Sequence, residues 1–384
     1  MSQTTIQLLW EERNIRPEFR AGVSLHSHTM YSEESLDMIP RYTGKVPFLG
    51  KAVRKESKRY QDKNCERLDF SRAFWTPPLS PRQAYRLEQK QLQNTFQRPG
   101  LVSLTDHDDI RAGAQLQVLN DFRNAPVSTE WTIPFGPTFF HLGVHNLPSA
   151  SATAIMGELR EFTAAPSPER LDQLLASLNE LPDVLLVLNH PLWDEKGIGI
   201  AEHAQVLGRL LERHGARLHA LELNGLRTWK ENQQVIWLGR QTGLPLISGG
   251  DRHGLEPNSI VNLTQGGTLA DFIHEIRYHR RSHVVFMPQY REPTKLRILQ
   301  TMVDIVRDYQ DNLEGRRSWS DRVYYRPTGS STALPLSNFW PEGKPLLIEM
   351  FVRAMRLAEF RGVRSALRLA LNDRPIWSDP EAAV

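Results

Sequence analysis

Histidines and acidic residues recur in this chain at one kind of position, directly after a short apolar run. Six such clusters occur: LHSHT at 25–29, LTDHD at 104–108, STE at 128–130, FHLG at 140–143, LNHP at 188–191 and SGGDRH at 248–253. Short apolar runs of this kind are typical of buried strands. In a barrel of alternating strands and helices, the carboxyl ends of the strands share one mouth. The pattern therefore favours a fold in which many strands end at one edge and bring these side chains together.

The sequence around these clusters alternates between short strand-like runs and longer helical patterns. Candidate strands cover 22–25, 101–104, 127–129, 139–144, 184–188, 218–223, 245–247 and 284–287, and candidate helices cover 81–94, 168–178, 201–214 and 228–242. Such alternation over roughly 270 residues predicts an α/β fold of the size of a TIM-like barrel, with a doubly wound sheet as the alternative. We expect the barrel over 20–290, an insertion after its first strand at about 38–75, and a C-terminal helical extension over 291–384.

Composition narrows the class of protein. Cys65 is the only cysteine, so the chain can form neither an internal disulfide nor a cysteine-rich zinc site. The N-terminal stretch lacks the features of a secretory signal, and the longest uncharged stretch, 131–157, contains prolines that rule out a spanning helix. We therefore expect a cytoplasmic protein without a membrane partner.

Charge is distributed unevenly along the chain. The chain has 47 lysines and arginines and 44 aspartates and glutamates. This difference is too small to favour nucleic acid as a partner. The segment 41–72, however, has ten basic and four acidic residues, a balance of +6. It is either a solvated insertion or a rim that captures an anionic substrate.

Imidazoles and carboxylates without thiolates suit Zn²⁺, Mn²⁺ or Fe²⁺. His26 and His28 are two residues apart, so in an extended strand they face the same side and can bind one ion. His141 is preferred to His145 as a ligand by spacing alone. Asp106 is a candidate either for a catalytic role or for supporting the ligands.

The motifs together resemble the PHP (polymerase and histidinol phosphatase) superfamily of metal-dependent phosphoesterases. The resemblance runs through HSHTMYSE, LTDHDD, STEWT, HLGVH, LNHP, ELNG and GGDRHG, from about residue 23 to about residue 287. It implies a distorted seven-stranded (β/α)7 barrel with two or three divalent metal ions. Ser24 stands where members of the superfamily usually have Asp, and Glu33 where Asp or His is more usual.

The resemblance also assigns ligands to individual ions. The first ion would be held by His26, His28, Glu130 and Asp251. Glu130 would bridge to a second ion held by His141 and His190, and a third would be held by Glu33, His107 and His253. The candidate catalytic residues are Asp251, His190 and Asp106.

This chemistry predicts a metal-dependent phosphoesterase that hydrolyses a phosphate ester of a small metabolite or short nucleotide by attack of metal-activated water. Arg227, Arg252 and Asn224 are candidates for binding the substrate, although an ordinary salt bridge explains either arginine equally well. The alternatives are an amidohydrolase-type reaction at the same metals, a regulatory module with a degenerate site, and a nucleic-acid-processing module, which is not favoured. The oligomeric state stays open.

Overall fold

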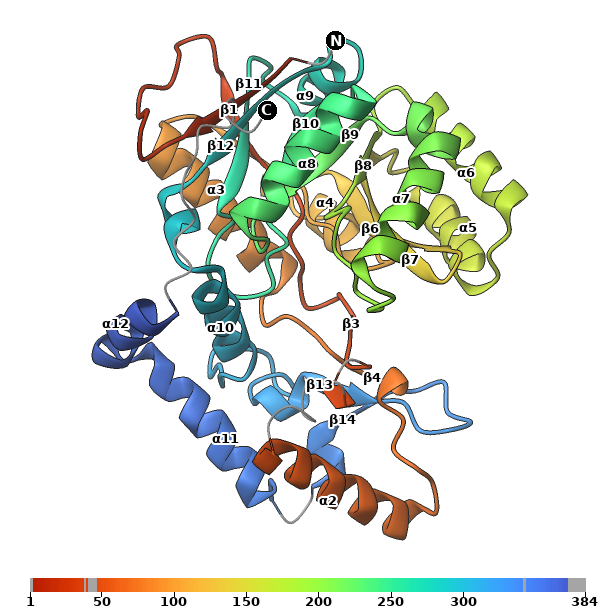
Figure 1. Cartoon of the computed structure of the whole chain (residues 1–384), viewed down its shortest axis with the longest axis vertical. Coiled ribbons are helices and arrows are strands. Elements are labelled where there is room, and N and C mark those ends of the chain that lie inside the picture. The colour runs from red at the N-terminus through yellow and green to blue at the C-terminus, as the bar shows by residue number, and fades with distance from the viewer. Residues whose placement is uncertain (1–2, 38, 41–46, 341–342, 372–384) are drawn as a thin grey trace. The chain divides into compact units, whose positions relative to one another are not determined.

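In the computed structural model, the described residues are 3–37, 39–40, 47–340 and 343–371, and they fold into two compact units (Figure 1). Unit 1 lies within Met1–Tyr31 and Leu79–Thr294, and unit 2 within Ser32–Pro78 and Lys295–Asn372. The described part of the predicted insertion and, from Lys295 onward, that of the predicted C-terminal extension thus belong to the same unit. The predictions for 38, 41–46, 341–342 and 372–384 lie outside the described residues.

The first sheet of unit 1 has the strand order β1-β12-β11-β2-β5. Its strands are β1 (Gln3–Leu8), β12 (Arg281–Phe286), β11 (Ile260–Thr264), β2 (Ala21–Ser24) and β5 (Gly100–Val102). The strand β1 runs parallel to β12, and β2 runs parallel to β5, whereas β11 is antiparallel to both of its neighbours.

The second sheet has the order β10-β9-β8-β7-β6. Its strands are β10 (Leu246–Gly249), β9 (Ala220–Asn224), β8 (Leu185–Leu188), β7 (Thr138–Leu147) and β6 (Val127–Phe135). Here β10, β9 and β8 are parallel, but β7 is antiparallel to both β6 and β8.

The predicted mixed α/β fold is confirmed, but ladder pairing among the described residues does not close the ten strands into one barrel. An isolated bridge between His107 and Glu130 links the β5 edge of the first sheet to the β6 edge of the second. Between the other two edges, β1 of the first sheet and β10 of the second, the Leu246 N–H donates to Thr4 Oγ1 over 3.0 Å. The two sheets are therefore linked at these edges by individual hydrogen bonds and an isolated bridge rather than by continuous ladders.

Helices pack beside these sheets in unit 1. They are α3 (Pro81–Phe96), α4 (Arg111–Gln117), α5 (Ala152–Ala164), α6 (Pro168–Glu180), α7 (Ile200–His214), α8 (Trp229–Thr242) and α9 (Leu269–Arg277). The start of α3 follows from its sequence: the Ser80 hydroxyl accepts from the Gln83 N–H, and Pro81 occupies the first turn. Gly243 ends α8 with a φ of 71°, which glycine adopts without strain.

Unit 2 contains a small sheet of order β14-β13-β4-β3. Its strands are β14 (Leu334–Pro335), β13 (Val323–Tyr325), β4 (Ala73–Trp75) and β3 (Glu34–Ser35). Its helices are α2 (Pro47–Asn64), α10 (Thr294–Ile305), α11 (Leu346–Arg356) and α12 (Arg361–Ala370). The region predicted as a C-terminal helical extension contains these helices and also β13, which pairs with β4 of the insertion.

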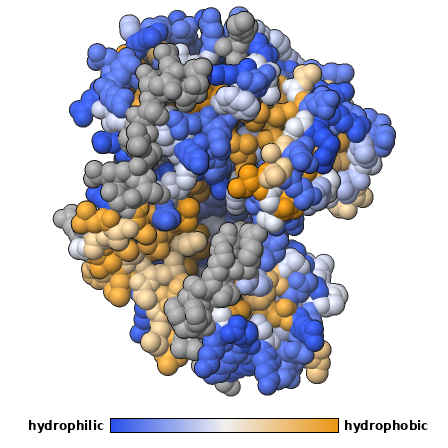
Figure 2. Space-filling view, in the orientation of Figure 1, coloured by the Kyte–Doolittle hydropathy of each residue, from blue (hydrophilic) through white to orange (hydrophobic). Residues whose placement is uncertain are grey.

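Short 3₁₀ helices occupy Phe70–Arg72, Asn120–Phe122, Gly215–Arg217, Pro288–Arg291, Trp319–Asp321, Leu336–Phe339 and Leu357–Glu359. Figure 2 shows an apolar surface over α10 and α12, where Met302 and Phe360 are among the exposed side chains. No described helix combines the length and the apolar character needed to cross a bilayer.

Candidate metal centre

Most of the predicted ligands lie where the sequence pattern expects them, at or just beyond strand ends. His26 and His28 follow β2, His190 follows β8 and Asp251 follows β10. His26, His190 and Asp251 have positive φ values of 60°, 26° and 52°. Non-glycine residues rarely adopt this conformation, and it often occurs at functional sites, where the surrounding structure compensates for the strain.

The side chains of His26, His28, Glu130 and Asp251 converge in the protein interior. The Nε2 atoms of His26 and His28 are 3.1 Å apart, and they lie 3.0 Å and 3.3 Å from Glu130 Oε2. Asp251 Oδ1 is 3.7 Å from His26 Nε2 and 3.5 Å from His28 Nε2. All four residues are at most 4% exposed.

Glu130 connects this group to two further histidines. Its Oε1 atom is 3.1 Å from His190 Nε2 and 3.4 Å from His141 Nδ1. The buried Nδ1 of His141 has no hydrogen-bond partner. Buried imidazole nitrogens that gather around both oxygens of one carboxylate form a donor set suited to divalent ions. The residues therefore fit a metal centre with Glu130 between two ligand groups.

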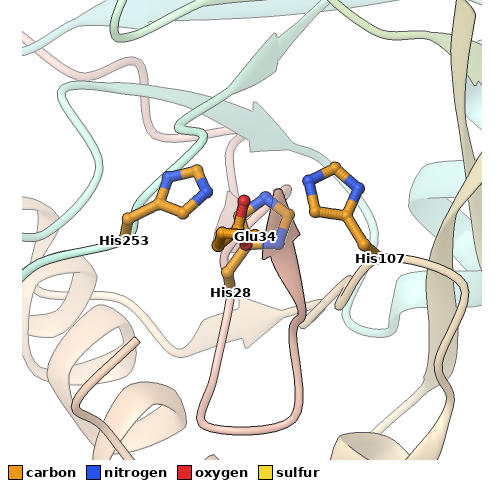
Figure 3. Close-up of side chains that lie close together, drawn as sticks. All are labelled: His28, Glu34, His107 and His253. Atoms are coloured by element: carbon orange, nitrogen blue, oxygen red, sulfur yellow. The ribbon is translucent and has the colours of Figure 1, made fainter. Parts of the chain in front are cut away.

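A third group contains His28, Glu34, His107 and His253, whose ligand atoms all lie within 4.8 Å of one another. Figure 3 shows these side chains turned toward one another. Glu34, six residues after His28, differs from the predicted ligand Glu33. Successive side chains in extended backbone point to opposite sides, so Glu34 is buried, whereas Glu33 is exposed and lies 3.4 Å from Arg326.

The charges within the centre shift several pKa values. Burial by itself would lower the pKa of His26, but the carboxylates of Glu130 and Glu222 raise it well above its usual value. Burial would raise the pKa of Glu130 and of Asp251, yet the surrounding histidines hold both well below the usual range. Burial lowers the pKa of His141 well below its usual value, against the opposing charge of Glu130. The two carboxylates are therefore ionised, as cation ligands must be.

Glu222 is a residue of the candidate centre that the sequence analysis does not single out. Its Oε1 is 2.5 Å from His26 Nδ1, while its Oε2 accepts from the His190 N–H over 2.7 Å. A Cβ on Gly249 would come within 1.5 Å of Glu222 Oε1, so only glycine leaves room for this carboxylate. Such a carboxylate fixes the orientation of a ligand imidazole. The signal was present in the ELNG motif, as an acidic residue inside the apolar strand β9.

Glu222 also bears on the absence of Asp at position 24. Ser24 donates to Glu88 Oε2 over 2.9 Å, so its hydroxyl supports a different carboxylate. The carboxylate partner of His26 is therefore supplied by β9 rather than by β2.

Arg252 was predicted to bind the substrate, but its side chain lies in the protein interior. It is 3% exposed, and its Nε is 3.0 Å from Glu88 Oε1. Its terminal nitrogens donate to the backbone carbonyls of Gly254 and His28, both over 2.9 Å. With these contacts the guanidinium holds the β10 loop against the loop after β2, so its role is structural.

Asn224 and Asp106 also support the site from within the protein. Asn224 Nδ2 donates to Glu222 Oε2 over 2.9 Å and lies 3.4 Å from Asp251 Oδ2. The two oxygens of Asp106 accept from the N–H and the hydroxyl of Thr29 over 2.5 Å and 2.7 Å. Both residues are buried, and through these contacts they support the side chains and the loop of the candidate centre.

Arg227 is the predicted substrate residue that lies beside the ligands. Its guanidinium stacks 3.7 Å from the Trp193 ring centroid, and its Nη2 is 3.9 Å from Asp251 Oδ2. Its side chain is 16% exposed. It is therefore a partly accessible cation at the edge of the centre.

The direction of β7 separates His141 from His145. The Asn189 N–H, just beyond β8, donates to the His141 carbonyl, whereas His145 pairs with Leu185 at the start of β8. Four strand residues span about 13 Å, so the two histidines lie toward opposite ends of the sheet. His145 Nδ1 is 2.8 Å from the Ser103 hydroxyl and takes no part in the three groups described above.

No protein-family model and no curated protein matches the chain. Among solved structures, it is similar to an amidohydrolase from Chromobacterium violaceum with bound sulfate and no metal, at 14% identity and a TM-score of 0.35, covering 60% of this chain and 87% of that one. It is also similar to a protein from Bifidobacterium adolescentis that is provisionally named a metal-dependent phosphoesterase. The two are 13% identical with a TM-score of 0.34, and the match covers 68% of this chain and 96% of that one. At TM-scores this low, neither likeness bears on the activity. The motifs that resemble the PHP superfamily nevertheless meet in buried His/Glu clusters, as that resemblance requires.

Proposed function

We propose that this chain is a metal-dependent phosphoesterase that hydrolyses a phosphate ester of a small metabolite or short nucleotide. The observation that carries the proposal is the burial of His26, His28, Glu130 and Asp251 around one point, with His141 and His190 on the other oxygen of Glu130. Two or three divalent ions held there would activate water and neutralise charge on a phosphoryl group.

The chain's own residues would position the reacting groups. Glu222 directs the Nε2 of His26 into the centre by accepting at its Nδ1. Asp251 is ionised, and its Oδ2 lies 3.4 Å from Asn224 Nδ2 and 3.9 Å from Arg227 Nη2. Arg227, stacked on Trp193, has the geometry to donate two parallel hydrogen bonds to phosphate oxygens. Among the candidate arginines, we therefore assign substrate binding to Arg227.

The test begins with elemental analysis of the purified protein after reconstitution with Mn²⁺, Zn²⁺ or Fe²⁺. We expect at least two ions per chain, and one ion or none would contradict the proposal. Phosphomonoesters, phosphodiesters and amides are then assayed with each metal. Cleavage of amides without cleavage of any phosphate ester would favour the amidohydrolase alternative.

A further inference from the structure

The helix α2 of unit 2 borders a pocket that the hydrolytic proposal does not use. Its volume is about 680 Å³, within the range of small-molecule sites, and Arg54, Lys58 and Arg67 line it. None of these three side chains forms an ion pair with another described residue. Asp62 is the single acidic residue of the lining, which leaves a net positive pocket.

The arrangement on α2 concentrates this charge. Arg54 and Lys58 are four residues apart and therefore lie one above the other on the same helix face. Arg67 faces them from the segment after the helix. Uncompensated cations on two sides of a pocket attract phosphate groups, to which arginine donates in a forked geometry.

The rest of the lining has a different character. Val53, Leu68 and Phe70 are partly buried and contribute an apolar surface beside the cations. An aromatic ring such as that of Phe70 provides a face on which a nucleobase or another planar group stacks. A ligand that satisfies both parts of the lining has a phosphate at one end and an aromatic group at the other.

We propose that unit 2 has a ligand site of its own, in which Arg54, Lys58 and Arg67 bind the phosphates of a small phosphorylated aromatic molecule, of the class of a nucleoside diphosphate, and Phe70 contacts its ring. The site consists entirely of residues of unit 2 and requires no metal ion. It does not depend on the identity of the reaction in unit 1.

Calorimetric titration of the metal-loaded full chain with α,β-methylene-ADP, an analogue that resists hydrolysis, tests this site. Because the phosphonate can also bind metal ions, the number of binding events is compared between variants. Arg54→Glu with Lys58→Glu should weaken one binding event about tenfold or more. The control, Lys55→Glu with Lys63→Glu, makes the same charge change on α2 outside the pocket lining and should leave that event unchanged. The proposal is overturned if the two double variants bind the analogue with equal affinity, or if no binding event changes in either variant.

Two further variants test each part of the ligand separately. Asp62→Asn removes the one carboxylate of the lining and should tighten binding, which a merely misfolded variant does not do. Phe70→Leu should weaken α,β-methylene-ADP but not methylenediphosphonate, which lacks the nucleoside. Unchanged affinity in Asp62→Asn would contradict the phosphate site, and equal effects of Phe70→Leu on both probes would contradict the aromatic contact.

Discussion

The two ends of the parallel strands in unit 1 both contain buried histidines, but in opposite electrostatic settings. At the carboxyl ends, Glu130 and Glu222 raise the pKa of His26 despite the burial that lowers it. Toward the amino ends, burial lowers the pKa of His145 and of His219 to about 3, and that of His283 to about 4. A nearby arginine lowers the pKa further at His219 and at His283.

The difference shows that burial of histidine does not by itself make a metal site. His219 is fully engaged by protein: its Nδ1 accepts from the Leu186 N–H over 2.9 Å, and its Nε2 lies 2.7 Å from Asn179 Oδ1. His26, in contrast, has one nitrogen held by Glu222 and the other directed at Glu130, His28 and Asp251. Carboxylates on the same buried side turn a packed imidazole into a candidate ligand.

The largest effect that this comparison predicts is at Asp251. Asp251→Asn removes a buried anionic ligand, so hydrolysis should fall at least about a thousandfold and bound metal should decrease, with little change in the fold. Steady-state assays with saturating metal and elemental analysis measure both. The matched control is Glu33→Gln, which should retain activity because Glu33 is exposed and lies beside Arg326. Full turnover in Asp251→Asn would refute the role of Asp251.

The next largest effect concerns stability at the same end of the strands. Arg252→Met leaves the buried carboxylate of Glu88 without its cation, which should cost about 3–5 kcal/mol in urea unfolding. Arg160→Met removes an exposed partner of Asp109 and should cost less than about 1 kcal/mol. Similar costs for the two variants would show that the Arg252–Glu88 pair does not hold the loops of the centre together.

A smaller effect is expected at Glu222. Glu222→Gln should weaken metal binding about 10- to 100-fold, because an amide orients the His26 imidazole less firmly than a carboxylate does. Competition with a metal-sensitive dye measures the affinity, and Glu212→Gln, an exposed position on α7, serves as the control. If the affinity of Glu222→Gln matched that of the control, Glu222 would be only a packing residue.

The smallest effect belongs to the amino ends of the strands. His219 is neutral in the folded chain, with its pKa lowered to about 3, whereas in the unfolded chain the pKa is near its usual value. Below about pH 6.5 the unfolded chain therefore binds more protons, and stability should fall by up to about 1.4 kcal/mol per pH unit. His219→Gln should show a shallower loss between pH 6.5 and pH 4.5 in urea unfolding at each pH. A slope identical to that of the wild type would contradict the neutral state of His219.

Much of the site could be predicted because it depends on local sequence. Apolar runs mark the strands, and the residues directly after them include His28, His190 and Asp251, which the structure brings together. The Ser80–Pro81 start of α3 and the Gly243 end of α8 follow from capping rules that involve only neighbouring residues.

Other features depend on contacts between distant parts of the chain. The choice of Glu34 over Glu33 depends on the side of the chain that faces His28, and the position of His145 depends on β7 running antiparallel to β8. Arg252 is directed inward by Glu88, which lies on α3 more than 160 residues earlier.

The sequence by itself thus determined the mixed α/β class and the imidazoles and carboxylates available at the strand ends, because periodicity and capping act within a few residues. Only the tertiary structure decided that the strands form two sheets, that Glu222 supports His26, and that two separated segments build unit 2. The physical reason is that strand pairing, strand direction and the burial of charge are set by long-range packing, which spacing along the chain does not encode.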